Sequence, residues 1–193
     1  MAKGYGSQSM VDPLRRVLVK RPEEAFAVED PVRWHYTGQP DLEVAQQEHD
    51  ALVNILREAG AEVLYHDELQ SDRADAIFVH DPAIVSDHGA IILRMGKDLR
   101  RGEEAAIARR IEELGVPIHH ELHDEARAEG GDLLWIDHDT LAVGQGLRTN
   151  EEGLRQLREA LEPLGVTLIP VPLPYYGGPD ACLHLMSLIS LVD

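Results

Sequence analysis

The chain has 193 residues, and its hydrophobic fraction of 44% is that of a globular protein with a sizeable core. Eighteen Lys and Arg against 35 Asp and Glu give a net charge of −17, which argues against nucleic acid or anionic lipid as a partner. The charge is compatible with a cationic substrate, but a solvated acidic surface explains most of it more simply. The single cysteine, Cys182, excludes an internal disulfide, and no apolar run approaches the ~20 residues of a membrane span.

The first nine residues are small and polar, and they lack the apolar stretch of a signal peptide. We therefore expect a flexible leader over residues 1–9, followed by a single domain over residues 10–193. A cytoplasmic location and no membrane partner are the corresponding expectations.

Three amphipathic helices are predicted in chain order, and each is closed by a glycine and followed by an apolar strand. Asn150 is the expected N-cap of the third helix. The helices cover residues 41–59, 103–114 and 150–164, the glycines are Gly60, Gly115 and Gly165, and the strands cover residues 61–66, 116–122 and 166–173.

These elements recur every 50 to 55 residues, measured between the closing glycines. Such a period is typical of stacked or radially arranged supersecondary units. Two strand-like runs precede the second helix, within residues 75–96, and two precede the third, within residues 131–146. The sequence therefore predicts an α/β fold of ββαβ modules: three modules and, in residues 182–193, the first strand of a fourth.

An acidic stretch in an apolar context spans residues 75–82. If the stretch is a strand, Asp75 and Asp81 lie on the same side of it because they are six residues apart. Two carboxylates on one side suit a planar cation such as guanidinium, which they bind through bidentate hydrogen bonds. The alternative, which the pattern alone favours, is that Asp75 starts the strand while Asp81 and Pro82 form a turn.

A second acidic stretch places Glu129 and Asp132 on either side of two glycines, ahead of an apolar run. Glycines let the backbone approach another group closely, which suits carboxylates held in a fixed geometry. A loop between two modules explains the same pattern equally well.

His184 lies between two leucines in the last apolar segment, where a strand would turn its side chain away from both. A histidine in such a strand is more often a core residue than a catalyst. Cys182 lies two residues earlier, roughly 6–7 Å away along a strand, which is too far for a direct cysteine–histidine hydrogen bond. We therefore expect Cys182 to be structural.

Neither a metal nor a cofactor is predicted. His119, His120 and His123 lack the His-Glu-x-x-His order and the further ligand of a zinc site. The sequence contains no P-loop, no dinucleotide-binding glycine pattern and no Gly-x-Ser-x-Gly elbow.

Five short motifs occur in one order, FVHDP, RRGEE, EGGD, RTN and CLHLMS, and PLRRVLVKRP precedes them. Together they make nearly the whole chain resemble the guanidine-modifying enzymes, which are the arginine deiminases, dimethylarginine dimethylaminohydrolases and amidinotransferases. The resemblance implies a pentein-like α/β propeller of five ββαβ modules, with the active site in its central channel.

The resemblance also implies roles for individual residues. His184 is implied to be the catalytic histidine, and Glu129 the carboxylate that orients it. Three kinds of substrate contact are implied as well: carboxylates that clamp the guanidinium, arginines that grip the α-carboxylate, and a neighbour of the clamp. These residues are, in that order, Asp75 and Asp81, Arg100 and Arg148, and His80.

At the position of His80, dimethylarginine hydrolases usually have Glu and deiminases usually have Arg, so the substrate is open between arginine, methylarginine and another guanidino compound. The nucleophile of these enzymes is a cysteine near the C-terminus, which we expect beyond residue 193, so that the chain alone is inactive. The expected function is citrulline-forming hydrolysis, with a homo-oligomer as one conceivable assembly. An amidinotransferase and a non-catalytic guanidino-binding module are the alternatives.

Overall fold

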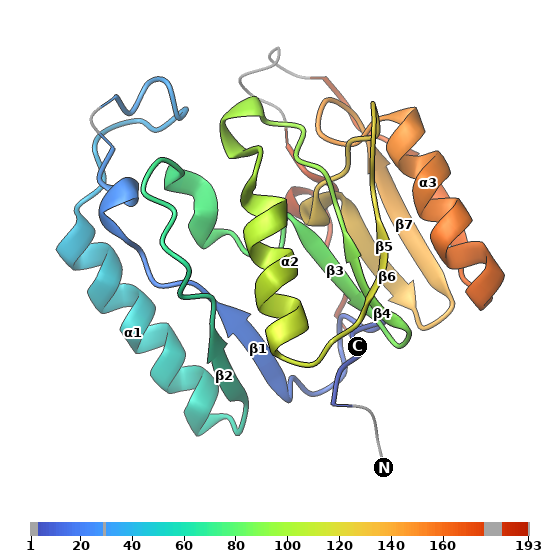
Figure 1. The fold of residues 1–193 in the computed structure, drawn as a ribbon, viewed down its shortest axis with the longest axis horizontal. Helices are drawn as coiled ribbons and strands as arrows, with labels where there is room; N and C mark the ends of the chain where they lie inside the picture. The colour runs from blue at the N-terminus through green and yellow to red at the C-terminus, as the bar shows by residue number, and fades with distance from the viewer. Residues whose placement is uncertain (1–3, 29, 176–182, 193) are drawn as a thin grey trace. The chain divides into compact units, whose positions relative to one another are not determined.

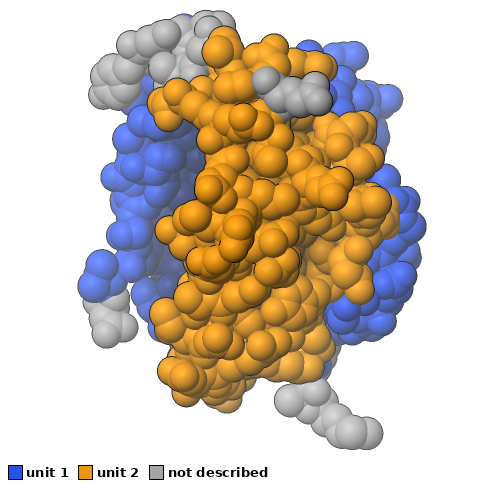
Figure 2. Space-filling view, turned by 90° about the vertical axis from the view of Figure 1, so that its left-hand side faces the viewer, with its two compact units in different colours: residues 1–12, 80–193 blue, residues 13–79 orange. Residues whose placement is uncertain are grey.

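The computed structural model describes residues 4–28, 30–175 and 183–192 (Figure 1). The chain divides into two compact units, one of residues 13–79 and one of residues 1–12 and 80–193 (Figure 2). This division differs from the single domain expected from residue 10 onward. In the described part of the chain, no helix combines the length and the hydropathy needed to cross a membrane.

The unit of residues 13–79 contains a pair of parallel strands connected by a long helix. β1 (Arg16–Val19) pairs with β2 (Glu62–Tyr65), and α1 (Leu42–Glu58) lies between them in the chain. Asp41 caps α1 by accepting the backbone N–H of Val44 at 3.1 Å. Two short 3-10 helices belong to this unit as well: η1 (Glu24–Phe26) and η2 (Ala74–Ile77).

The larger unit contains two three-stranded sheets of the same topology. In each, the first two strands are antiparallel, and a helix returns the chain to a third strand parallel to the second. The elements of the first are β3 (Ala83–Ser86), β4 (Gly89–Ile92), α2 (Glu103–Glu113) and β5 (Ile118–Glu121). Those of the second are β6 (Leu133–Asp137), β7 (Thr140–Gln145), α3 (Glu151–Leu161) and β8 (Thr167–Pro172). Short 3-10 helices in this unit are η3 (Asp98–Arg100), η4 (Gly130–Asp132), η5 (Glu162–Leu164) and η7 (Leu185–Ser187).

Both sheets confirm the predicted ββαβ order, and the helices begin and end within a few residues of the prediction. Asn150 caps α3 as expected, accepting the backbone N–H of Gly153 at 2.8 Å. The predicted closing glycines have φ values of 91°, 77° and 89°: Gly60, Gly115 and Gly165. The number of modules in the whole protein and their closure into a propeller remain predictions.

The core of the larger unit joins its two sheets to α3. Fully burying one leucine or isoleucine side chain contributes roughly 1.5–3 kcal/mol, so this cluster holds the two sheets together and fixes the loops at their ends. Its members with an exposure of 1% or less include Ile91, Leu93, Leu133, Leu141, Val143, Leu157 and Leu161.

Two segments predicted as strands are 3-10 helices in the structure, which corrects the sequence analysis. The first is η2, in which the N–H of Phe78 donates to the carbonyl of Asp75 at 3.0 Å. The second is η7, in which the N–H of Ser187 donates to the carbonyl of His184 at 3.0 Å. Each turn makes within itself the hydrogen bonds that a strand makes with a neighbour. Cys182 lies outside the described residues.

Gln8, which lies within the expected leader over residues 1–9, is 8% exposed. Its Nε2 donates to the carbonyl of His138 at 2.7 Å, and its Oε1 accepts the N–H of Asp87 at 2.8 Å. These partners lie in the hairpin turns β6–β7 and β3–β4, so one side chain bridges the two sheets of the larger unit.

Candidate active site

A buried carboxylate, that of Glu129, lies at the centre of the candidate site. Glu129 directly precedes η4 and has an exposure of 0%. Its Oε1 accepts the backbone N–H groups of Gly96 and Lys97 at 2.8 and 3.0 Å. These two bonds fix the carboxylate relative to the loop after β4, because charge-assisted hydrogen bonds are among the stronger ones.

Two side chains from distant parts of the chain complete the shell around Glu129. Nε2 of His184 lies 2.8 Å from its Oε2, and Nη1 of Arg148 lies 3.0 Å from Oε2 and 3.3 Å from Oε1. Both side chains are partly exposed, at 23% for His184 and 21% for Arg148, whereas Glu129 is not. The structure thus brings together the predicted catalytic pair, together with one of the predicted substrate-binding arginines.

This arrangement shifts the pKa of both members of the pair. Burial on its own raises the pKa of Glu129, but the hydrogen bond from His184 and the charge of Arg148 bring it down to about 2. Burial on its own lowers the pKa of His184, but the hydrogen bond to Glu129 and the nearby carboxylates of Asp81 and Asp132 raise it above its ordinary value. Both shifts favour the charged forms, an imidazolium ion beside a carboxylate.

The two glycines after Glu129 leave the space that this packing needs. A Cβ on Gly130 would lie 2.0 Å from the carbonyl oxygen of His80, and one on Gly131 would lie 2.6 Å from the ring of His184. The backbone of η4 therefore passes closer to both residues than any other amino acid permits. His80 itself is exposed, and this contact places it beside η4.

A second buried network connects Asp81, Arg100 and Glu103. Nη1 of Arg100 lies 2.5 Å from Asp81, and its Nη2 lies 2.7 Å from Glu103. Burial lowers the pKa of Arg100, but the two carboxylates outweigh it and keep the guanidinium charged. The remaining carboxylate oxygen of Asp81 accepts the N–H of Gly131 at 3.1 Å, which ties this network to η4.

The contacts of Arg100 differ from those expected of a residue that binds the substrate. Arg100 is 2% exposed, and three of its hydrogen bonds go to Glu103, whose own exposure is also 2%. A guanidinium bound on two sides by protein carboxylates is poorly placed to grip the α-carboxylate of a substrate. The geometry instead favours a role for Arg100 in holding Asp81.

Asp132 and Thr149 form a further buried pair, whose importance the sequence analysis missed. Both have an exposure of 0%. Oγ1 of Thr149 donates to Oδ2 of Asp132 at 2.7 Å, and Oδ1 of Asp132 accepts the backbone N–H of Leu185 at 2.9 Å. The signal that was available is their position in the motifs EGGD and RTN, which also contain Glu129 and Arg148.

Asp75 belongs to the unit of residues 13–79. It is 6% exposed, and its Oδ1 accepts the hydroxyl of Tyr36 at 2.6 Å. The ring of Tyr36 packs against Phe26, at 6.0 Å between ring centroids. The predicted strand that would align Asp75 with Asp81 is wrong, because Asp75 lies in η2. Asp81 lies in a turn, as the alternative prediction stated.

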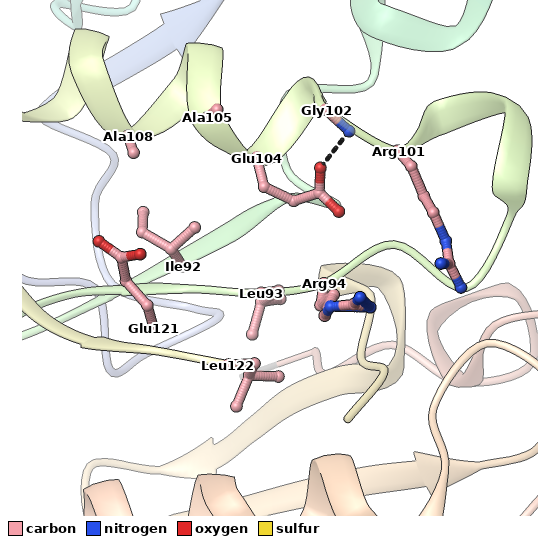
Figure 3. A pocket seen from close by; sticks show the side chains of 10 residues that line it. All are labelled: Ile92, Leu93, Arg94, Arg101, Gly102, Glu104, Ala105, Ala108, Glu121 and Leu122. Carbon is pink, nitrogen blue, oxygen red and sulfur yellow. Dashed lines mark hydrogen bonds between the residues drawn. The ribbon is translucent and has the colours of Figure 1, made fainter. Parts of the chain in front are cut away.

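A cavity of about 310 Å³ lies in the larger unit, between α2 and the ends of β4 and β5 (Figure 3). Among the described residues that line it, none is a site residue predicted from the sequence. Its lining includes Glu104, which accepts the backbone N–H groups of Met95 at 2.8 Å and Gly102 at 2.5 Å. Glu104 thereby ties together the two ends of the loop that binds Glu129.

The three histidines considered for zinc do not form a ligand cluster. His119 lies beside His88, with ring centroids 6.3 Å apart, and its Nε2 lies 3.1 Å from the carbonyl of Ala160. His123 is paired with Asp124 at 2.8 Å. Over residues 4–28, 30–175 and 183–192, no group of three His, Cys, Asp or Glu side chains is arranged to hold a metal ion.

Comparison with known proteins places this geometry in a family. Residues 32–174 match the family described as N,N-dimethylarginine dimethylhydrolase, eukaryotic. The chain belongs to this family. The match covers both motifs that supply the partners of the site, EGGD and RTN, and it ends before His184.

Individual members of the dimethylarginine hydrolase family are similar over most of the chain. The N(G),N(G)-dimethylarginine dimethylaminohydrolase of Streptomyces coelicolor is 35% identical over 178 residues, and that of Pseudomonas aeruginosa is 27% identical over 181 residues. The matched parts are 92% and 93% of this chain, but 65% and 66% of those proteins. The chain thus spans about two thirds of their length.

Solved structures agree with this family assignment. A cysteine-to-serine variant of the Pseudomonas aeruginosa enzyme, complexed with citrulline, has a TM-score of 0.73 and 25% identity, covering 89% of this chain and 64% of that one. The N-terminal domain of ArgZ, a cyanobacterial arginine dihydrolase, shares the fold with a TM-score of 0.70 at 21% identity. The family match and the similar dimethylarginine hydrolases confirm the predicted membership among guanidine-modifying enzymes, and the solved structures confirm the α/β fold class.

Proposed function

We propose that this chain supplies the substrate-binding residues and the acid–base group of a hydrolase that converts arginine or a methylated arginine to citrulline. The observation that carries the proposal is the hydrogen bond of 2.8 Å between His184 and the fully buried Glu129. Buried pairs whose pKa values are shifted by specific partners are typical of catalytic sites. The names of the similar proteins support a guanidino compound as the substrate.

The substrate of such a reaction is a cation, and the chain offers carboxylates to bind it. We propose that Asp75 and Asp81 clamp the guanidinium and that His80 contacts its distal substituent. Each of the two aspartates is already oriented by a donor, Asp75 by Tyr36 and Asp81 by Arg100. A carboxylate has about four acceptor positions, so an oriented aspartate still accepts bonds from a ligand.

The first chemical step is the attack of a cysteine thiolate on the guanidinium carbon. The new C–S bond gives a neutral tetrahedral adduct, and the imidazolium of His184 then donates a proton to the departing nitrogen. The C–N bond breaks, the amine leaves, and a cationic thiouronium remains on the cysteine. Because Nε2 of His184 donates to Glu129, Nδ1 is the nitrogen that transfers the proton in this proposal.

The second step is hydrolysis of the thiouronium by water. Neutral His184 takes a proton from the water as its oxygen adds to the carbon, and the C–S bond then breaks to release the thiolate. One proton restores the imidazolium, a second passes to solvent, and the product is the ureido group of citrulline. Glu129 stabilises the imidazolium in both steps without exchanging a proton, because its pKa is about 2.

We propose that Arg148 contacts the α-carboxylate of the substrate, as the family resemblance implies. Its side chain is 21% exposed, whereas that of Arg100 is almost completely buried. A planar guanidinium binds one carboxylate with part of its N–H groups and can bind a second with others. We propose that Arg148 links Glu129 to the substrate in this way.

The nucleophile is proposed to be a cysteine other than Cys182. Cys182 precedes His184 by only two residues, and attack requires the sulfur roughly 3–3.5 Å from the guanidinium carbon. In the protein encoded by the full reading frame, Cys182→Ala should therefore retain turnover. Loss of turnover in a folded Cys182→Ala protein would identify Cys182 as the nucleophile.

The function is tested by product analysis with arginine, monomethylarginine and dimethylarginine. We expect citrulline and the corresponding amine from the protein encoded by the full reading frame, and a loss of about 10²–10⁴-fold in kcat when it carries His184→Ala. His138→Ala, which alters a 65% exposed histidine, serves as the control. A guanidino product transferred to an added amine would identify an amidinotransferase instead, and binding without any product would identify a non-catalytic module.

A further inference from the structure

The carboxylate of Asp132 connects the two halves of the candidate site through buried hydrogen bonds. Its Oδ1 accepts the backbone N–H of Leu185, the residue directly after His184, at 2.9 Å. Its Oδ2 accepts the hydroxyl of Thr149 at 2.7 Å. The first bond spans 53 residues of the sequence, so it fixes the chain carrying His184 against η4.

Thr149 acts on the other side of the same carboxylate. It is 0% exposed and lies between Arg148, which binds Glu129, and Asn150, which caps α3. Its Oγ1 also lies 3.4 Å from the backbone N–H of Glu129. One hydroxyl thereby contacts both the backbone that presents Glu129 and the carboxylate that holds the histidine segment.

Burial of the Asp132 carboxylate costs the folded state free energy. Its exposure is 0%, and both of its hydrogen-bond donors are neutral groups, a hydroxyl and an amide. A buried carboxylate without a cation in contact is poorly compensated for its lost hydration. Burial accordingly raises its pKa. Stabilisation of the fold is therefore a weak explanation for a charge at this position.

We propose that Asp132 is the positioning residue of the His184–Glu129 pair, and that Thr149 positions Asp132. The carboxylate fixes the backbone at Leu185 so that the imidazole reaches Glu129, and its charge favours the protonated imidazole. Only the catalytic meaning of this arrangement rests on the proposed hydrolase function. The positioning itself is a property of these described residues and is testable without turnover.

A purely structural role is the competing explanation. The side chain of Leu185 is 5% exposed and packs with Leu134 and Ala142, and in this explanation the apolar contact alone holds the segment in place. If it does, removing the carboxylate leaves the histidine where it is. The experiment must therefore follow His184 directly, and not only the stability of the protein.

The test is an NMR comparison of wild-type chain, Asp132→Ala, Asp132→Asn and Thr149→Val. Two quantities are measured: hydrogen exchange of the Leu185 amide and the pKa of the His184 ring. Asp137→Ala and Thr167→Val are the matched controls, since they alter an exposed aspartate in β6 and an exposed threonine in β8.

We expect Asp132→Ala to accelerate Leu185 amide exchange at least tenfold and to lower the pKa of His184 toward its ordinary value. Thr149→Val should shift both quantities in the same directions. Asp132→Asn should restore protection of the Leu185 amide, because an amide oxygen still accepts the bond, but not the raised pKa. Both controls should match the wild type.

Unchanged exchange and an unchanged His184 titration in folded Asp132→Ala would overturn the proposal and leave the apolar packing of Leu185 as the cause. If Asp132→Ala does not fold, Thr149→Val decides by the same two criteria. In the full-length enzyme, Asp132→Asn should lower kcat with little change in KM. A wild-type enzyme without turnover would refute the proposed function, while the NMR result would still decide the positioning.

Discussion

Nη1 of Arg148 lies 3.0 Å from one carboxylate oxygen of Glu129 and 3.3 Å from the other. The buried carboxylate thus has a permanently charged partner in addition to His184, whose charge depends on pH. This difference matters because Glu129 remains compensated when His184 loses its proton. A site in which the histidine cycles between both forms requires such a partner.

Replacing Glu129 should destabilise the protein and also release His184. Glu129→Gln keeps an acceptor for the amides of Gly96 and Lys97 but removes the charge that faces Arg148 and His184. Hydrogen bonds to charged groups contribute about 1.5–3 kcal/mol, so we expect a loss of about that size in urea unfolding. The pKa of His184, measured by NMR, should fall.

Glu125→Gln is the matched control, because Glu125 is an exposed glutamate four residues away in the same segment. It should change the unfolding free energy by less than about 0.5 kcal/mol. Equal losses in the two variants would show that the buried shell around Glu129 contributes nothing specific.

The stabilising effect of the pair should be confined to a window of pH. The folded pKa of Glu129 is about 2, below its ordinary value of 4.5, so its contribution is present above about pH 4.5 and is lost as pH falls toward 2. The pKa of His184 is raised above 6.5, so its contribution is complete below about pH 6.5 and is lost as pH rises through the folded pKa. The difference in unfolding free energy between wild type and Glu129→Gln should therefore be largest between about pH 4.5 and 6.5. A difference that is constant from pH 3 to 9 would contradict this coupling.

Two adjacent arginines should respond very differently to the same substitution. Arg100→Met leaves the buried carboxylates of Asp81 and Glu103 without their cation, and breaking a buried pair typically costs about 3–5 kcal/mol. Arg101→Met removes an ion pair to Asp98 between side chains that are 45% and 86% exposed, and breaking such an exposed pair costs at most about 1 kcal/mol. Urea unfolding of both variants measures the contrast, and similar losses would mean that the Arg100 network is not a structural element.

The hydroxyl of Tyr36 should stabilise the unit of residues 13–79 through Asp75. Tyr36→Phe removes one donor to a buried carboxylate, for which we expect a loss of about 1.5–3 kcal/mol in unfolding. Tyr175→Phe, at a 60% exposed tyrosine, should be neutral. A neutral Tyr36→Phe would show that Asp75 does not depend on Tyr36.

The helices and the ββαβ order were predictable because their signals are local. An N-cap such as Asn150, a closing glycine such as Gly115 and the 3.6-residue apolar period each specify their element within a few residues of sequence. The hydrogen bond between Glu129 and His184 could not be predicted from the sequence on either side of the two residues. Its expectation came from the resemblance of the motifs EGGD and CLHLMS to a family.

The 3-10 helices η2 and η7 were not predictable as such, because distant groups contribute to their formation. In η7 the N–H of Leu185 is bound by Asp132, 53 residues earlier, and an alternating apolar pattern carries no information about that bond. The contacts of Arg100 were not predictable for a similar reason. Its Nη1 donates to Asp81, which lies 19 residues away in the sequence.

The spacing of the partners of Glu129 also has a consequence for synthesis of the chain on the ribosome. Arg148 follows Glu129 by 19 residues, whereas His184 follows it by 55. Closing the longer loop costs roughly 1 kcal/mol more entropy, and its last residue is translated later. Arg148, the permanently charged partner of Glu129, is therefore synthesised first. His184, the titratable partner, is synthesised only after all three strands of the sheet β6–β7–β8.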